Sequence, residues 1–168
     1  MEPNAAAELR KAYRITVLIG VAMLGTLIVY AVIVEFIKQQ NAPFGGFNPL
    51  SNAIDALRYA LLGVAGVVFF VIRTVNKTIL SAKTTVVRNT SAAGPFGPDA
   101  QRLIYAAIVT FALCESVAIY GLILFVLQGN TLDFYLFLLL SLVYFGIYFP
   151  RYGTWEEWMQ DKEKAARK

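Results

Sequence analysis

Four long apolar segments constrain the fold of this chain more than any other feature. They cover approximately residues 15–37, 53–72, 103–127 and 132–149. Each is close to the ~20 residues that an α-helix needs to cross ~30 Å of hydrocarbon. Only 15% of the 168 residues are charged, whereas soluble domains carry about 25%. We therefore predict an all-α integral membrane protein with four transmembrane helices, arranged as two antiparallel hairpins.

The rest of the chain leaves no room for a separate soluble domain, so residues 1–168 are expected to form one membrane domain. The first apolar run is longer than the ~7–15 residues of a signal peptide core and precedes no small-residue cleavage site, which predicts a retained helix. After the fourth span, Thr154 and Glu157 have the spacing of a capping box. They predict a short interfacial helix over residues 155–166.

The positive charges indicate the topology. Thirteen of the fifteen Lys and Arg residues lie before the first span, in the 73–102 connection or in the 150–168 tail, and only Lys38 and Arg58 lie on the opposite side. By the positive-inside rule, both termini, the 73–102 loop and the tail are cytoplasmic. The formal charge of +4 thus reflects topology, and no nucleic-acid partner is expected. The expected location is a bacterial cytoplasmic membrane, with membrane lipid as a partner.

Several kinds of chemistry are excluded. The chain has no histidine and one cysteine, Cys114, which lies inside the third span. Disulfides, Cys/His zinc sites and imidazole catalysis are therefore ruled out. No two carboxylates lie at the same predicted depth. We expect no catalytic residue, no metal centre and no enzymatic activity.

Glu115 is the most informative residue, because no other charge lies within twelve residues on either side of it. A charged group at the bilayer centre costs at least ~2.5–3.5 kcal/mol, so such groups usually face protein and have a function. One interpretation is that Glu115 carries an ion or a proton. The other is that it is a protonated or hydrogen-bonded acid that ties helices together, through Tyr120, Thr110 or another subunit.

Small residues on the second and third spans predict close packing of these two helices, because small side chains let membrane helices approach. Glu115 is expected at the edge of this contact. The predicted packing residues are Gly63, Gly66, Cys114, Ala118 and Gly121.

The run from Glu115 to Leu122, Glu-Ser-Val-Ala-Ile-Tyr-Gly-Leu, resembles the ion-carrying helix of the c subunit (proteolipid) of rotary ATPases. The topology of the second and third spans is similar to that of the c-subunit hairpin. The resemblance implies that Glu115 is the ion-binding carboxylate. It also implies that Ser116 and Tyr120 are the hydroxyls that, in sodium-type members, coordinate the ion or hold the carboxylate.

A proton or a sodium ion is therefore the only cofactor that we expect. The glutamine that sodium-type members carry on the inner helix has no counterpart in residues 60–71, which favours protons. The leading hypothesis is a proteolipid-like protein that binds or translocates protons or ions, as a homo-oligomer or a subunit of a membrane complex. The alternative is a non-transporting scaffold or accessory subunit.

Overall fold

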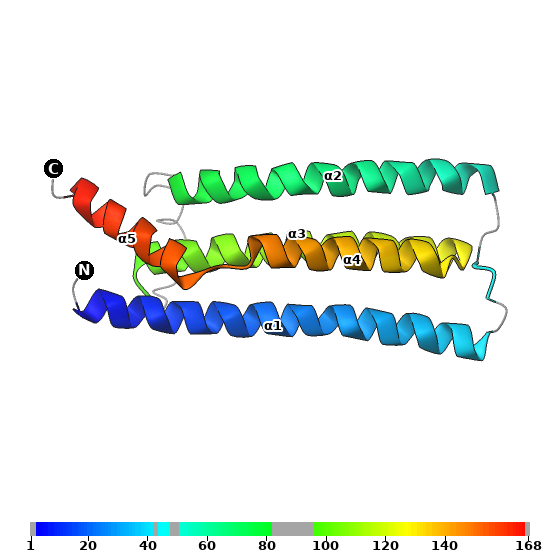
Figure 1. Cartoon of the computed structure of the whole chain (residues 1–168), viewed down its shortest axis with the longest axis horizontal. Coiled ribbons are helices and arrows are strands. Elements are labelled where there is room, and N and C mark those ends of the chain that lie inside the picture. Colours follow the sequence, from blue (N-terminus) through cyan, green and yellow to red (C-terminus); the bar gives the residue numbers. More distant parts are fainter. Residues whose placement is uncertain (1–2, 42–43, 48–50, 82–95, 167–168) are drawn as a thin grey trace.

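The computed structural model describes residues 3–41, 44–47, 51–81 and 96–166. These residues form α-helices and, within the described ranges, no strand. The helices are α1 (Pro3–Gln40), α2 (Ser51–Ser81), α3 (Pro98–Gln128), α4 (Thr131–Tyr148) and α5 (Tyr152–Ala166) (Figure 1). α1 to α4 run along one common direction, and the shorter α5 continues beyond α4 at the end of the bundle where α1 begins.

α1, α2, α3 and α4 are each long and apolar enough to cross a membrane. At ~1.5 Å per residue, the 18 residues of α4 cover about 27 Å, close to the ~30 Å of a hydrocarbon core. The 38 residues of α1 cover about 57 Å, so α1 extends well past the bilayer. The predicted all-α fold with four transmembrane helices is confirmed. α2 continues to Ser81, and the glycine- and proline-rich part of the predicted 73–102 loop lies mostly outside the described residues.

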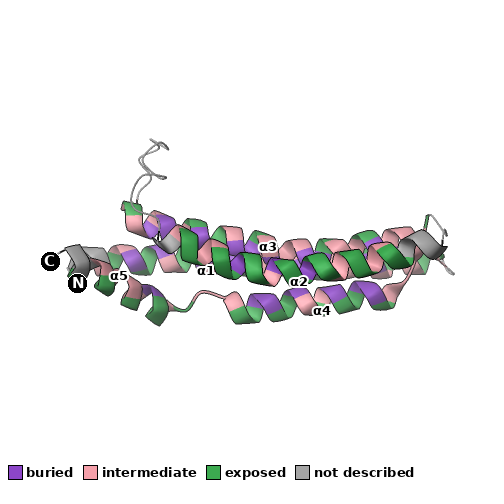
Figure 2. Cartoon of the chain, turned by 90° about the horizontal axis from the view of Figure 1, so that it is seen from above, coloured by how far each residue is buried: buried purple, intermediate pink, exposed green. Residues whose placement is uncertain are grey.

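α3 is the central helix. It packs against α4, α1 and α2, and its buried residues occur on several sides of the helix. Figure 1 shows α3 and α4 between α1 and α2, and Figure 2 shows α3 and α4 on opposite sides of that pair. α3 therefore packs on all three other long helices, whereas α4 packs mainly on α3.

This arrangement changes one part of the predicted architecture. The α3–α4 hairpin is tightly packed, as the short 128–131 connection indicates. α1 and α2 are consecutive and antiparallel, but each packs on α3 and they are not packed against each other. The first hairpin is therefore split by α3. Because lipid is as apolar as a leucine side chain, hydrophobicity alone does not hold two consecutive helices together.

α2 contacts α3, as predicted, but with a different face. Ala65, Val68 and Ile72 are the buried residues of α2, whereas a Cβ built on Gly63 or Gly66 would have open space around it. The prediction that these two glycines pack on α3 is therefore wrong within one chain. Bulkier side chains on the opposite face fill the space between the helices instead.

The small residues predicted on α3 do pack closely, but one of them faces α4. A Cβ on Gly121 would lie 2.7 Å from Cβ of Phe137 and 3.0 Å from the carbonyl oxygen of Phe134. Cys114 and Ala118 are fully buried. The absence of a side chain at Gly121 thus sets how near α3 and α4 approach.

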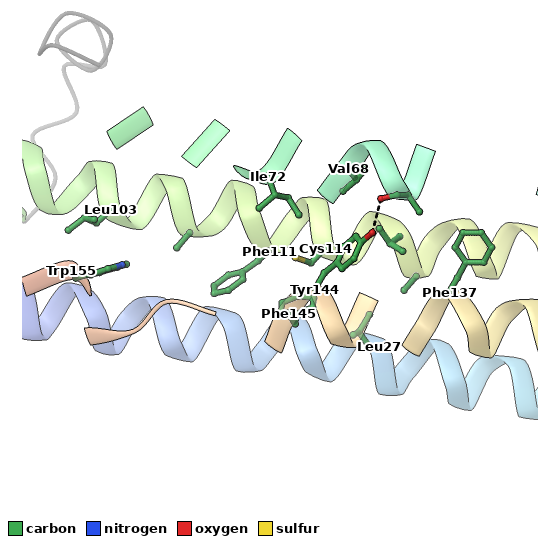
Figure 3. Close-up of a cluster of buried hydrophobic side chains, with 14 of the residues drawn as sticks. Leu27, Val68, Ile72, Leu103, Phe111, Cys114, Phe137, Tyr144, Phe145 and Trp155 are labelled. Atoms are coloured by element: carbon green, nitrogen blue, oxygen red, sulfur yellow. Dashed lines mark hydrogen bonds between the residues drawn. The ribbon is translucent and has the colours of Figure 1, made fainter. Parts of the chain in front are cut away.

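Hydroxyl groups connect the helices through backbone carbonyls. Tyr144 donates to the carbonyl of Ala65 at 3.0 Å, the hydrogen bond drawn in Figure 3, and Tyr148 donates to that of Phe69 at 3.1 Å. Ser141 of α4 donates to the carbonyl of Cys114 at 2.7 Å. Such bonds contribute about 0.6 kcal/mol on average in a membrane protein. The two tyrosine bonds join α4 to α2, although the backbones of these two helices are not packed against each other. The serine bond joins α4 to α3.

α5 lies against the start of α1. It begins at Tyr152, three residues before the predicted start at Trp155. The ring of Tyr13 packs edge-on against Tyr152 and Trp155, and its hydroxyl donates to the carbonyl of Pro150 at 3.3 Å. These contacts fix the position of α5 relative to the bundle.

Candidate functional site around Glu115

The carboxyl group of Glu115 is bonded to α1. Its Oε1 atom accepts a hydrogen bond from the Tyr30 hydroxyl at 2.8 Å and lies 2.8 Å from Oγ1 of Thr26. Glu115 is half-buried. Its second oxygen, Oε2, has no hydrogen bond with the described part of the chain. The carboxyl group is therefore held through one oxygen atom by two side chains of α1.

The geometry of α1 explains why two of its side chains reach one oxygen atom. Thr26 and Tyr30 are four residues apart, so they lie one above the other on the same face of the helix. That face packs on α3 through the buried residues Leu27 and Val34. α1 and α3 run in the same direction across the bundle, so the middle of one helix lies beside the middle of the other. Figure 3 shows Leu27 of α1 at the level of Phe145 and Tyr144, beside α3.

The Thr26 hydroxyl has two neighbours for its single proton. Oγ1 lies 2.6 Å from the carbonyl oxygen of Met23 as well as 2.8 Å from Glu115 Oε1. If Thr26 donates to Met23, its bond to Glu115 requires a proton on the carboxyl group. If Glu115 is ionised, the Thr26 hydroxyl donates to Oε1 and no longer donates to the carbonyl of Met23. The same three oxygen atoms can therefore accommodate both protonation states through the rotation of one hydroxyl group.

No basic side chain neutralises this carboxyl group among the described residues. The ion pairs of the bundle lie at the helix ends, where Arg58 meets Asp133 at 2.8 Å and Lys38 meets Glu35 at 3.0 Å. Glu115 has hydroxyl partners alone. An ionised carboxylate without a counter-ion has a high free energy in a membrane. Binding of a proton or a cation would therefore stabilise Glu115 at this position.

The three residues implied by the proteolipid resemblance are not brought together. The Ser116 hydroxyl donates to the carbonyl of Leu113 in its own helix at 2.8 Å. Tyr120 is half-buried, and its hydroxyl has no hydrogen bond within the described ranges. Thr110, the other expected partner, pairs instead with Asn76 of α2 at 3.0 Å. Of the predicted ion-binding set, only Glu115 lies in the cluster, and its partners come from α1.

Thr26 and Tyr30 were missed because the sequence argument considered only the second and third spans. One signal could have identified them. Thr26 and Tyr30 lie near the middle of the first apolar segment, and Glu115 lies at the middle of the third. Two parallel helices place their midpoints at the same depth, so hydroxyl groups in the middle of the first span were the natural partners.

The described residues contain no group of three or more Asp, Glu, Cys or His side chains that could hold a metal ion. Comparisons with protein-family models, with curated proteins and with solved structures give no match to this chain.

Proposed function

We propose that this integral membrane protein binds a proton at Glu115, in the middle of the bilayer, and exchanges it in the course of its function. The observation that carries the proposal is the pair of hydroxyl contacts on Oε1 without a basic partner in the described chain. The role is that of a carrier or of a subunit in a transporting complex, without enzymatic activity. The resemblance of α3 to the proteolipid helix supports the same role.

The ionised and the neutral form of a carboxyl group differ in free energy within a membrane. A bare carboxylate is strongly disfavoured in hydrocarbon, because desolvation favours the neutral form of an acid. Hydroxyl groups are the partners that can serve both forms, since each can donate to a carboxylate or accept from a carboxylic acid. The site is thus arranged for exchange as well as for retention.

The second candidate function is a scaffold in which Glu115 only locks α1 onto α3. The observation that favours it is that both contacts of Oε1 are made across this helix pair. A scaffold needs the hydrogen bonds but not the acid. Replacing Glu115 with glutamine separates the two functions, because the amide oxygen accepts the same bonds but the side chain does not ionise.

The experiment uses the full chain in proteoliposomes. A hydrophobic carbodiimide, which attacks protonated carboxyl groups in membranes, should modify Glu115 in the wild type at neutral pH. An infrared spectrum should contain a carboxylic-acid band that changes with pH and is absent from Glu115→Gln. Glu35→Gln is the matched control, because Glu35 lies near the end of α1 beside Lys38 and should leave both signals unchanged. A wild type without labelling or acid band would leave the scaffold as the better interpretation.

We further propose that the protein works as a homo-oligomer or as part of a larger membrane complex. The exposed face of α2 supports this, since Gly63 and Gly66 have no neighbour in one chain and small residues favour close helix contacts in membranes. Light scattering of the detergent-solubilised protein should give more than one copy. Gly63→Leu should reduce that number, and a monomeric wild type would contradict the homo-oligomer.

A further inference from the structure

A cavity of about 410 Å³ lies at the end of the bundle where α4 gives way to α5. Binding sites for small molecules typically have volumes of ~300–1,000 Å³, so this one is large enough for part of an organic ligand. It exists because α4 ends at Tyr148 while α2 and α3 are helical there and α5 starts only at Tyr152. It does not include Glu115 and is independent of the proposed function.

The inner wall of the cavity is apolar. Its buried apolar residues on α3 are Leu103, Ala106 and Ala107, and the exposed Ile147 of α4 also lines the cavity. The two alanines leave the volume that larger side chains would fill. A chain of methylene groups gains from contact with such a wall, about 0.8 kcal/mol for each methylene group removed from water.

The outer part of the cavity has a different chemistry. Arg151, Thr154 and Trp158 line it there. Arg151 is exposed and has no ion pair within the described chain. Arg73 of α2 is also exposed, and it lies three residues before Asn76, another lining residue, and so on the same side of α2. A cationic rim over an apolar interior is complementary to an anionic amphiphile.

The wall formed by α5 is fixed in place. Lys162 bonds to Asp99 of α3 at 3.0 Å and lies 4.7 Å from the centre of the Trp158 ring. Trp155 is buried against α1 through Tyr13. The tryptophans, with Tyr148, form the aromatic belt typical of the membrane–water interface. The aromatic belt places the cavity at the depth expected for lipid headgroups.

We propose that this cavity binds one phospholipid of the adjacent leaflet with an anionic headgroup, the phosphate beside Arg151 and an acyl chain along the wall of α3. Asn76 can bind the ester region. Its amide pairs with Thr110, and the amide has further donor and acceptor capacity. A free phosphate ion would use only the rim and leave the apolar wall exposed to water.

The test measures lipid binding to the full chain in detergent by native mass spectrometry. The probes are phosphatidylglycerol, phosphatidylcholine with the same acyl chains, and inorganic phosphate. One phosphatidylglycerol should bind per chain, about fivefold more tightly than phosphatidylcholine, the factor expected for one basic side chain at a membrane surface. Inorganic phosphate should neither bind nor raise the unfolding temperature. Equal affinity for the two lipids, or an equal effect of phosphate, would overturn the proposal.

Two variants with matched controls locate the site. Arg151→Gln should remove the preference for phosphatidylglycerol, whereas Arg14→Gln, another exposed arginine near the same end of the bundle, should keep it. Ala107→Leu should weaken binding of both lipids by filling the cavity, whereas Ala22→Leu on the exposed face of α1 should not. If Ala107→Leu does not fold, the arginine pair decides the result. A preference that survives Arg151→Gln would contradict the assignment.

Discussion

The hydroxyl group of Tyr30 in α1 donates to Oε1 of Glu115 in α3, 85 positions away in sequence, at 2.8 Å. This bond, with the neighbouring contact of Thr26, links the first span to the third at mid-membrane. It makes the first span part of the carboxyl site, where the proteolipid resemblance implied a site built on α3 alone. The following variants test that difference.

Tyr30→Phe should weaken the α1–α3 contact, whereas Tyr120→Phe should not. Interhelical hydrogen bonds in membrane proteins contribute about 0.6 kcal/mol on average and at most about 1.7 kcal/mol. We expect a loss within that range for Tyr30→Phe, measured by unfolding in mixed detergent micelles. Tyr120 is the matched control, because it loses the same atom without losing a hydrogen bond in the described chain.

The same two variants can be compared by carbodiimide modification of Glu115. Tyr30→Phe should change its rate, and Tyr120→Phe should leave it as in the wild type. The reverse result, with Tyr120 controlling the modification, would show that the functional site is the one implied by the proteolipid resemblance and not the cluster seen here.

Gly121→Ala should destabilise the protein, and Gly146→Ala should not. The added Cβ at Gly121 would lie 2.7 Å from Cβ of Phe137 and 3.0 Å from a backbone oxygen, neither of which is the end of a flexible side chain. Overpacking of this kind costs about 1–3 kcal/mol. At Gly146 of α4 the added methyl group meets nothing within 4 Å, and alanine in a helix is favoured over glycine by about 0.5–1 kcal/mol. Equal unfolding temperatures for the two variants would contradict the α3–α4 packing.

Arg58→Met should lower the stability of the protein more than Lys38→Met does. Asp133 has a side chain only 2% exposed and pairs with Arg58 at 2.8 Å, whereas both partners of the Lys38–Glu35 pair are more than a third exposed. Removing one partner of a fully buried pair costs about 3–5 kcal/mol, and because Arg58 is partly exposed we expect about 1–3 kcal/mol. The exposed pair should contribute at most about 1 kcal/mol. Asp133→Asn should restore part of the stability of Arg58→Met, and its failure to do so would exclude the pair as the cause.

The sequence was sufficient to predict the helices and their membrane location. The number of spans follows from the length and hydropathy of the apolar runs, and the close α3–α4 hairpin follows from the short 128–131 connection. Both features are local in sequence. Glu115 could be selected for the same reason, since its isolation among apolar residues is visible in one segment.

The lateral order of the helices could not be predicted in the same way. Apolar faces that pack on protein and apolar faces that meet lipid have similar composition, so hydropathy does not say which of two helices lies beside a third. The small residues of α2 predict a packing face, but Gly63 and Gly66 face outward and Ala65, Val68 and Ile72 are the buried residues of the part of α2 whose burial is described. With α1 assigned to a separate hairpin, its Thr26 and Tyr30 were not considered as partners for the carboxyl group.

The topology can be tested by accessibility of single cysteines in a Cys114→Ala background. The basic residues predict that the 73–102 loop is cytoplasmic and the 39–50 connection external. Gly45 is a suitable external position, because a Cβ there meets nothing within 4 Å, whereas Gly46 has a φ of 81° and a Cβ would clash with the carbonyl oxygen of Leu127. A membrane-impermeant reagent should label Gly45→Cys and not Ser91→Cys in intact cells. Labelling of Ser91→Cys alone would reverse the orientation.

We expect the ion bound at Glu115 to be a proton. Sodium is a hard cation that requires several oxygen ligands at once. Beside Glu115 Oε1 the cluster offers the Thr26 and Tyr30 hydroxyls and the carbonyl of Met23, which the Thr26 hydroxyl already contacts at 2.6 Å. Ser116 is bonded to its own helix at 2.8 Å and contributes no ligand. The two hydroxyls lie at hydrogen-bond distance from Oε1, 2.8 Å each, an arrangement that favours a proton over a sodium ion.

Carbodiimide modification of Glu115 should therefore proceed at the same rate in sodium and in potassium buffers of equal ionic strength and pH. Ser116→Ala should behave as the wild type in both buffers, while Glu115→Gln should show no modification at all. Protection by sodium that disappears in Ser116→Ala would contradict the proton assignment. It would mean that the Ser116 hydroxyl leaves Leu113 to coordinate a cation, as the sodium-type proteolipid resemblance implies.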